Sequence, residues 1–175
     1  MSSSKPPIPE WLADASFEDL FLRGASRQPV QPDALRTVAA SPDVPPKLRV
    51  LAHELLIDAG RAPDLSLAET YCLTLPDAFP HNAWGMPGQY TERLGKTIVA
   101  FGKAALPFLI KLLADQRPLG YFGSEEPTLS EAMQYRVGDL AAYLASLIAG
   151  VPYRDAPDTD TRDVFIRELM IGLRG

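Results

Sequence analysis

Apolar residues recur at helical spacing along this chain, most regularly between residues 135 and 150. Six of them fall at i, i+3, i+4, i+7, i+10 and i+11 and form one complete face: Val137, Leu140, Ala141, Leu144, Leu147 and Ile148. Four polar residues share the opposite side: Arg136, Asp139, Tyr143 and Ser146. An apolar face of this kind is typical of a helix that packs on a core. The pattern therefore predicts a helix over 135–150 with one polar face.

Shorter amphipathic helices are predicted by the same spacing elsewhere in the chain. The clearest covers 47–59, where Gly60 stands at the position of a C-cap glycine. A first helix is predicted after a cap at Ser16, and further helices are predicted over 33–40, 66–75, 91–102 and 106–113. A last helix is predicted after a cap at Thr159 or Thr161, with its final apolar residue at Leu173. No stretch alternates apolar and polar residues as a half-buried strand does. We therefore expect an all-α fold.

Seventeen prolines stand mostly between these segments. Proline is tolerated in the first turn of a helix and breaks its interior. The prolines therefore predict short helices separated by stiff corners. The length of 175 residues suits one domain. We expect a flexible N-terminal arm over 1–10 and a single, compact α-helical domain over 11–175.

Composition and charge exclude several classes of protein. The formal net charge is −5 and no basic run occurs, which argues against a nucleic-acid partner. No run of 18 apolar residues is present, so we expect no membrane segment. The start of the chain lacks the apolar region of a secretory signal, and Cys72 is the sole cysteine. These features predict a cytoplasmic protein.

Two fragments of catalytic motifs are incomplete. Gly95-Lys96-Thr97 resembles the end of a phosphate loop, but Tyr90 stands where that loop needs its first glycine. His53-Glu54 opens like a zinc-protease helix, but Ile57 stands where the second histidine is required. We expect neither a nucleotide nor a zinc site. His53 is interpreted as a solvated or capping residue at the border of an apolar face.

The remaining chemical groups do not form a recognisable catalytic or metal motif either. An EF-hand loop starting at Asp158 would need Gly and Glu where the chain has Asp163 and Leu169. Carboxylates at this position are explained by the start of a helix. Cys72 has no cationic neighbour in sequence that would activate it as a nucleophile. We expect no cofactor and no metal, and the residues argue more against an enzyme than for one.

Two segments share an order of features. Each has a short apolar helix, a corner with Asp and Pro, and a second helix with an Arg-Val pair, a Leu-Ala pair and a final glycine: 34–60, and 105–116 together with 135–150. On these features the chain resembles HEAT-like α-helical repeats, which implies antiparallel helix pairs that offer a face for binding proteins. Some 20 residues separate Asp115 from Arg136, where the family has a short turn.

Two loops carry aromatic residues and are the candidate binding surface, together with the polar face of 135–150. They cover 81–90 and 117–127. Long loops in small domains are often functional, and aromatic side chains make good interface anchors. The candidate site residues are Trp84, Tyr90, Tyr121, Phe122, Glu125, Glu126, Arg136 and Tyr143. The alternative is that the aromatic rings fold back and cover the apolar ends of the helices.

The leading functional hypothesis is a non-catalytic protein–protein interaction module, such as an adaptor, an inhibitor or an immunity-type protein. One alternative is a small enzyme or small-molecule binder with a pocket under the two loops. Another is a structural subunit of a homo-oligomer. An enzyme should show a pocket in which two titratable side chains meet, whereas a binding module should show an exposed aromatic patch. We expect any site to lie where the 117–127 loop meets Arg136.

Overall fold

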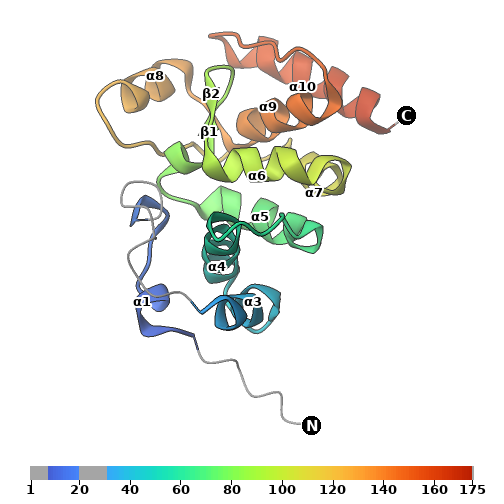
Figure 1. Cartoon of the computed structure of the whole chain (residues 1–175). Coiled ribbons are helices and arrows are strands. Elements are labelled where there is room, and N and C mark those ends of the chain that lie inside the picture. The colour runs from blue at the N-terminus through green and yellow to red at the C-terminus, as the bar shows by residue number, and fades with distance from the viewer. Residues whose placement is uncertain (1–7, 20–30, 175) are drawn as a thin grey trace.

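The computed structural model describes residues 8–19 and 31–174 and is mostly helical, which confirms the all-α prediction (Figure 1). The α-helices in chain order are α1 (Glu10–Ala13), α3 (Pro32–Ala40), α4 (Pro46–Asp58), α5 (Ala68–Thr74), α6 (Arg93–Phe101), α7 (Leu106–Leu112), α8 (Glu126–Met133), α9 (Val137–Ala149) and α10 (Thr159–Arg174). Single 3₁₀ turns are η2 (Leu65–Leu67), η3 (Leu75–Asp77), η4 (His81–Ala83) and η5 (Gly102–Ala104).

Prolines stand in the first turns of α3, α4, α7 and α8, as expected for a chain of short helices with stiff corners. At the other end, Gly150 follows α9 with a φ of 68°, a conformation that glycine adopts without steric cost. Ser16 is an N-cap, because its Oγ accepts the backbone N–H of Asp19 at 3.0 Å. Leu20 and Phe21, which continue the apolar spacing of this predicted helix in the sequence, lie outside the described residues.

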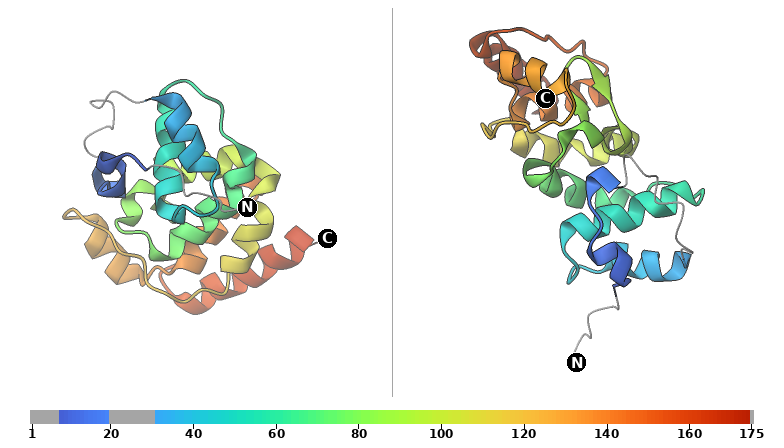
Figure 2. Two further views of the ribbon diagram at one scale, coloured as in Figure 1. Left: turned by 90° about the horizontal axis from the view of Figure 1, so that it is seen from below. Right: turned by 90° about the vertical axis from the view of Figure 1, so that its left-hand side faces the viewer.

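The helices are layered in chain order, from α3 and α4 at one end to α9 and α10 at the other (Figures 1 and 2). One hydrophobic core runs through all the layers, from Leu12 to Leu169. Within it α3 packs on α4 and α7 packs on α9. These are the two helix pairs that carry the HEAT-like resemblance, and membership of that family stays a prediction.

Residues at both ends of the described chain belong to this core. Of the arm expected over 1–10, residues 1–7 lie outside the described residues, and Ile8 packs against the core. No helix within 8–19 and 31–174 has the length and apolar character that crossing a bilayer requires.

The polar face of α9 is buried, so the expectation that it lies on the surface is wrong. Asp139 and Ser146 are 0% exposed and Arg136 is 8% exposed, while Tyr143 is half-buried. The reason is that α6, α7 and α10 all pack against α9. The Ser146 hydroxyl is satisfied within the helix, where it donates to the carbonyl of Ala142 at 2.7 Å.

The 81–90 segment is not the irregular loop that its composition suggested. After η4 the chain forms an antiparallel hairpin of two short strands, β1 (Gly85–Met86) and β2 (Tyr90–Thr91). Gly85 has a φ of 120°, and a Cβ at this position would lie 2.5 Å from the carbonyl oxygen of Tyr90. The hairpin escaped sequence analysis because each strand has only two residues and therefore shows no alternation.

Two glycines in helices allow close approach of a neighbouring backbone. A Cβ on Gly138 would lie 2.7 Å from the carbonyl oxygen of Leu113, in the segment that leads away from α7. A Cβ on Gly95 would lie 2.0 Å from the carbonyl oxygen of Trp84. The glycine of the apparent phosphate-loop fragment is therefore explained by packing of α6 on η4 and β1.

We predict that Gly138→Ala lowers the free energy of unfolding by about 1–3 kcal/mol, because the added methyl group meets a backbone carbonyl. Gly172→Ala on α10 is the matched control, since nothing lies within 4 Å of its Cβ position. Alanine should raise the free energy of unfolding there by about 0.5–1 kcal/mol. Urea unfolding measures both, and equal effects of the two substitutions would contradict the packing explanation.

Candidate functional site

The 117–127 segment begins with an extended stretch, residues 117–122, which we call the strap. On one side it pairs with the chain before α9: the Leu119 N–H donates to the Tyr135 carbonyl at 3.0 Å, and the Val137 N–H donates to the Arg117 carbonyl at 2.9 Å. On the other side, the His81 N–H donates to the Gly120 carbonyl at 2.8 Å. Backbone hydrogen bonds on both sides therefore hold the strap, which is not a free loop.

Side chains from 81–90 complete this attachment. The Asn82 amide pairs with the backbone of Phe122, accepting its N–H at 2.9 Å and donating to its carbonyl at 3.1 Å. The Tyr121 hydroxyl donates to the Gly85 carbonyl at 2.9 Å. The structure thus brings together the two segments that sequence analysis selected separately.

Most of the predicted aromatic anchors face inward. Trp84 is 0% exposed and Tyr121 is 8% exposed, so neither ring offers a binding surface. Trp84 makes edge contacts with Phe17 and Tyr71 in the core. Burial of an aromatic ring removes about 150–250 Å² from water, which favours these inward positions. For these two residues the alternative interpretation, that the rings fold back onto the core, is correct.

The other predicted residues lie nearer the surface. Glu125 is exposed, while Tyr90, Phe122, Glu126 and Tyr143 are half-buried. The Tyr143 hydroxyl accepts a hydrogen bond from the Thr91 hydroxyl at 3.2 Å. Partial burial raises the pKa of Tyr90 above its ordinary value.

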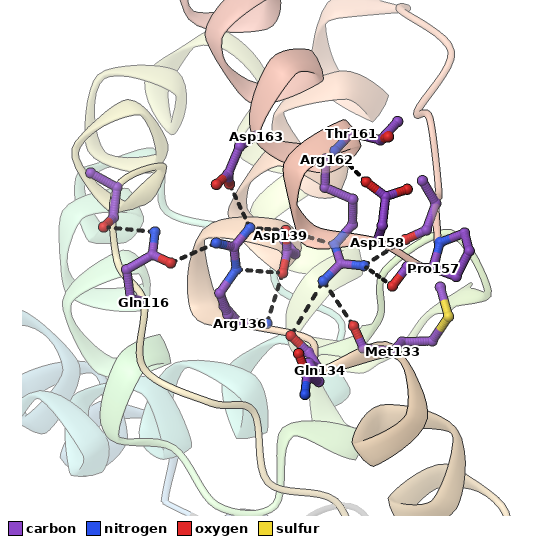
Figure 3. A network of polar contacts seen from close by, with 12 residues as sticks. Gln116, Met133, Gln134, Arg136, Asp139, Pro157, Asp158, Thr161, Arg162 and Asp163 are labelled. Carbon is purple, nitrogen blue, oxygen red and sulfur yellow. Dashed lines mark hydrogen bonds and ion pairs between the residues drawn. The ribbon is translucent and has the colours of Figure 1, made fainter.

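Arg136 belongs to a buried network with Asp139, Arg162 and Asp163, which we call the arginine–aspartate network (Figure 3). The Arg136 guanidinium donates to both carboxylate oxygens of Asp139, at 3.1 and 3.0 Å, and its backbone N–H donates to the same carboxylate at 2.8 Å. Arg162 donates to Asp139 at 3.2 Å. Arg136 and Asp139, which stand at i and i+3 on the polar face, are therefore paired in the interior.

The outer donors of the two arginines reach other segments. Arg136 donates to the Gln116 side chain at 2.5 Å and to Asp163 at 2.7 Å. Arg162 donates to the carbonyls of Ala156 and Met133, at 2.5 and 2.8 Å. The hydrogen bonds with Asp139 raise the pKa of Arg136 further above its ordinary value. The network therefore joins the chain before the strap, the end of α8, the start of α9, the chain after α9 and the start of α10.

A groove of about 630 Å³ lies between the strap and α8, at the point where the strap meets Arg136. Its lining residues are Gln116, Pro118, Leu119, Gly120, Tyr121, Pro127, Ser130, Glu131, Gln134, Tyr135, Arg136 and Thr159. Helix α8 contributes Pro127, Ser130 and Glu131 at i, i+3 and i+4, which is one helical face, and Gln134 follows as its C-cap. The groove has a buried base of Leu119, Tyr121 and Tyr135, and an exposed edge that includes Gln116, Glu131 and Gln134.

An exposed aromatic ring lies beside this groove. Phe79 is 62% exposed, although its neighbours Ala78 and Pro80 are buried. Its ring contacts the strap at Gly120, where a Cβ would approach a ring carbon to 2.9 Å. Sequence analysis missed Phe79, and the available signal was an aromatic residue before a proline in a short corner.

Three of the four titratable side chains in the groove are already engaged. Tyr121 donates to Gly85, Tyr135 donates to Asp155 at 2.8 Å, and Arg136 is paired in the network. Burial raises the pKa of Tyr121 and, together with the hydrogen bond to Asp155, that of Tyr135. At neutral pH both tyrosines therefore stay protonated and keep their hydrogen bonds as donors.

A second cluster centres on Glu54, which lines a separate pocket of about 470 Å³ together with Arg93 and Thr97. Glu54 is 1% exposed. One of its carboxylate oxygens accepts from Tyr71 at 2.6 Å and from Thr97 at 2.7 Å, and the other accepts from Arg93 at 2.7 Å. Through these partners the cluster joins α4, α5 and α6. Because both carboxylate oxygens already accept hydrogen bonds, Glu54 is not left free to act as a base.

His53 extends this cluster and is not solvated. It is 2% exposed, and its Nε2 accepts the backbone N–H of Asp64 at 2.9 Å. Its Nδ1 therefore carries the proton and donates to Tyr71 at 2.8 Å. Burial lowers the pKa of His53. The interpretation of His53 as a solvated or capping residue is therefore wrong, because the ring is buried within α4 and binds the loop before η2.

Three aspartates around the start of α10 make structural hydrogen bonds, and Cys72 is buried. Asp158 caps α10 by accepting the Thr161 N–H at 2.8 Å, in place of the threonine cap expected from sequence. Asp155 binds Tyr135, and Asp163 binds Arg136. Burial raises the pKa of Cys72 to about 12. Within the described part of the chain, no three His, Cys, Asp or Glu side chains are placed to hold a metal ion.

No family model matches this chain, and neither a curated protein nor a solved structure shows significant similarity to it.

We predict that stability falls in mild acid because two histidines are buried. Burial lowers the pKa of His81 below 6.5, and its Nδ1 accepts the Gly120 N–H at 2.9 Å. The unfolded chain therefore binds protons first as the pH falls through 6.5, and the free energy of unfolding decreases by up to about 1.4 kcal/mol per pH unit for each histidine.

Urea unfolding of the wild type and of His81→Gln at pH 7.5 and pH 5.5 measures this effect. We expect the variant to lose less stability than the wild type between the two pH values, because one of the two buried histidines is gone. An equal loss in both proteins would show that His81 does not carry this pH dependence.

Proposed function

We propose that this protein is a non-catalytic protein-binding module that takes a segment of a partner protein into the groove between the strap and α8. The volume of about 630 Å³ lies within the range of about 300–1,000 Å³ that is usual for ligand sites. The base of the groove is apolar and buried, and its edge is polar, as in protein interfaces.

The observation that carries this proposal is the exposed ring of Phe79 beside the groove. An exposed aromatic side chain whose backbone is fixed by buried neighbours binds with little loss of conformational entropy. Phe79 has this character, since Ala78 and Pro80 on either side are buried. Phe79 would therefore be the exposed interface anchor, the role that the sequence predicted for Trp84 and Tyr121.

The size of the groove favours an extended segment over a helix. A helix is about 10–12 Å across and rises about 5.4 Å per turn, so each turn occupies roughly 400–600 Å³. The groove would therefore hold only about one helical turn. An extended segment turns alternate side chains toward the apolar base and leaves the others at the edge.

Several features favour this proposal over an enzyme that works on a nucleic acid or a small molecule. Three of the four titratable side chains in the groove already have hydrogen-bond or ion-pair partners, which disfavours acid–base catalysis. The net charge of −5 disfavours a nucleic-acid substrate. Cys72 is buried and forms no disulfide, which fits action in the cytoplasm. A HEAT-like origin, with α3–α4 and α7–α9 as its units, fits a binding role as well.

A peptide selection with a blocked groove tests the proposal. Random peptides are selected on the wild type, and their affinities are compared for Glu131→Trp and Ala132→Trp. Glu131 lines the groove from α8, and Ala132 is exposed on the same helix but does not line it. We expect the selected peptides to lose at least tenfold in affinity on Glu131→Trp and to bind Ala132→Trp like the wild type.

Circular dichroism of both tryptophan variants verifies that each is folded. A selection that yields no binders, or binders that Glu131→Trp does not weaken, would contradict the proposed site.

A further inference from the structure

We infer that the segment bound in this groove is basic, with Lys or Arg alternating with apolar residues. The inference rests on the proposed function and specifies the chemistry of the partner. It follows from the charges of the described lining residues, among which Glu131 is negative and the one cation, Arg136, is paired with carboxylates.

The edge of the groove carries an acidic side chain, that of Glu131. Glu131 lines the groove from α8, is exposed and is the one carboxylate among the described lining residues. Asp158 and Asp160 stand on either side of the lining residue Thr159 and are exposed, and Asp158 caps α10. A bound segment therefore meets the charge of Glu131 directly, and the acidic start of α10 adds to the negative field nearby.

The cations near the groove are matched by carboxylates of their own. Arg136 is paired with Asp139 at 3.0 Å and with Asp163 at 2.7 Å. Arg117 lies between the lining residues Gln116 and Pro118 and is paired with Asp115 at 2.7 Å and with Asp77 at 2.8 Å. These pairs cancel the positive charge locally, so the acidic edge sets the sign of the potential that an approaching segment meets.

The pattern of the partner follows from the geometry of an extended chain. Alternate side chains of such a segment point to opposite faces. Apolar residues at every second position would contact the base near Leu119 and Tyr135, and the intervening Lys or Arg side chains would lie at the acidic edge. A cation at one end would also be attracted by the exposed ring of Phe79.

Fluorescence anisotropy with three labelled peptides of eight residues tests the inference. All three share the same alternating leucines, and the intervening positions are Lys, Gln or Glu. At 50 mM salt we expect the Lys peptide to bind at least tenfold more tightly than the Gln peptide, and the Glu peptide to bind more weakly still. The difference should shrink at 0.5 M salt, because exposed charges are then screened.

Two charge-reversal variants provide the matched comparison. Glu131→Lys should weaken the Lys peptide about three- to tenfold and strengthen the Glu peptide. Asp43→Lys changes the net charge equally at an exposed position in the corner between α3 and α4, and it should leave both affinities unchanged. Equal weakening by the two variants would mean attraction to the overall charge and would overturn the inference.

The remaining outcomes separate this inference from the proposed function. If the Gln peptide binds as tightly as the Lys peptide and Glu131→Trp abolishes both, the groove binds protein segments but the basic partner is wrong. If sedimentation shows a dimer that Glu131→Trp dissociates, the occupant is a second copy and the inference fails. If none of the peptides binds, and the random selection also fails, the proposed function is overturned with it.

Discussion

The half of the molecule that contains the groove depends on one buried carboxylate, that of Asp139. A charge without solvent is tolerated only when it is paired and hydrogen-bonded. Arg136 and Arg162 supply this pairing from one side chain before α9 and one within α10. Removal of one partner from such a buried pair typically costs about 3–5 kcal/mol, because the remaining charge stays buried without compensation.

The network also fixes the shape of the groove. Arg136 reaches Gln116 at the entrance to the strap, and Arg162 reaches the carbonyl of Met133 at the end of α8. Both walls are therefore attached to the same carboxylate through one arginine each. A groove whose walls are held in place before binding loses less conformational entropy when a partner arrives. On the proposed function, the buried polar groups would thus serve binding by holding the groove in shape.

The sequence predicts the helices and their proline corners because both depend on local spacing. The close approach at Gly138 also has a local signal, since a glycine early in a strong helix calls for a packing reason. The burial of Asp139 is not predictable in this way, because Arg162 stands 23 residues further along the chain and only the fold brings it near. For the same reason the sequence identifies Trp84 as an aromatic residue in a polar segment but not as part of the core.

Asp139 holds the two walls of the groove together, and amide hydrogen exchange in the wild type and in Asp139→Asn is the most direct test. In the variant we expect protection to fall selectively at Leu119 and Val137, whose amides join the strap to the chain before α9, while Leu55 in the distant helix α4 keeps its protection. Wild-type protection of the Leu119 and Val137 amides in Asp139→Asn would show that Asp139 does not hold the strap in place.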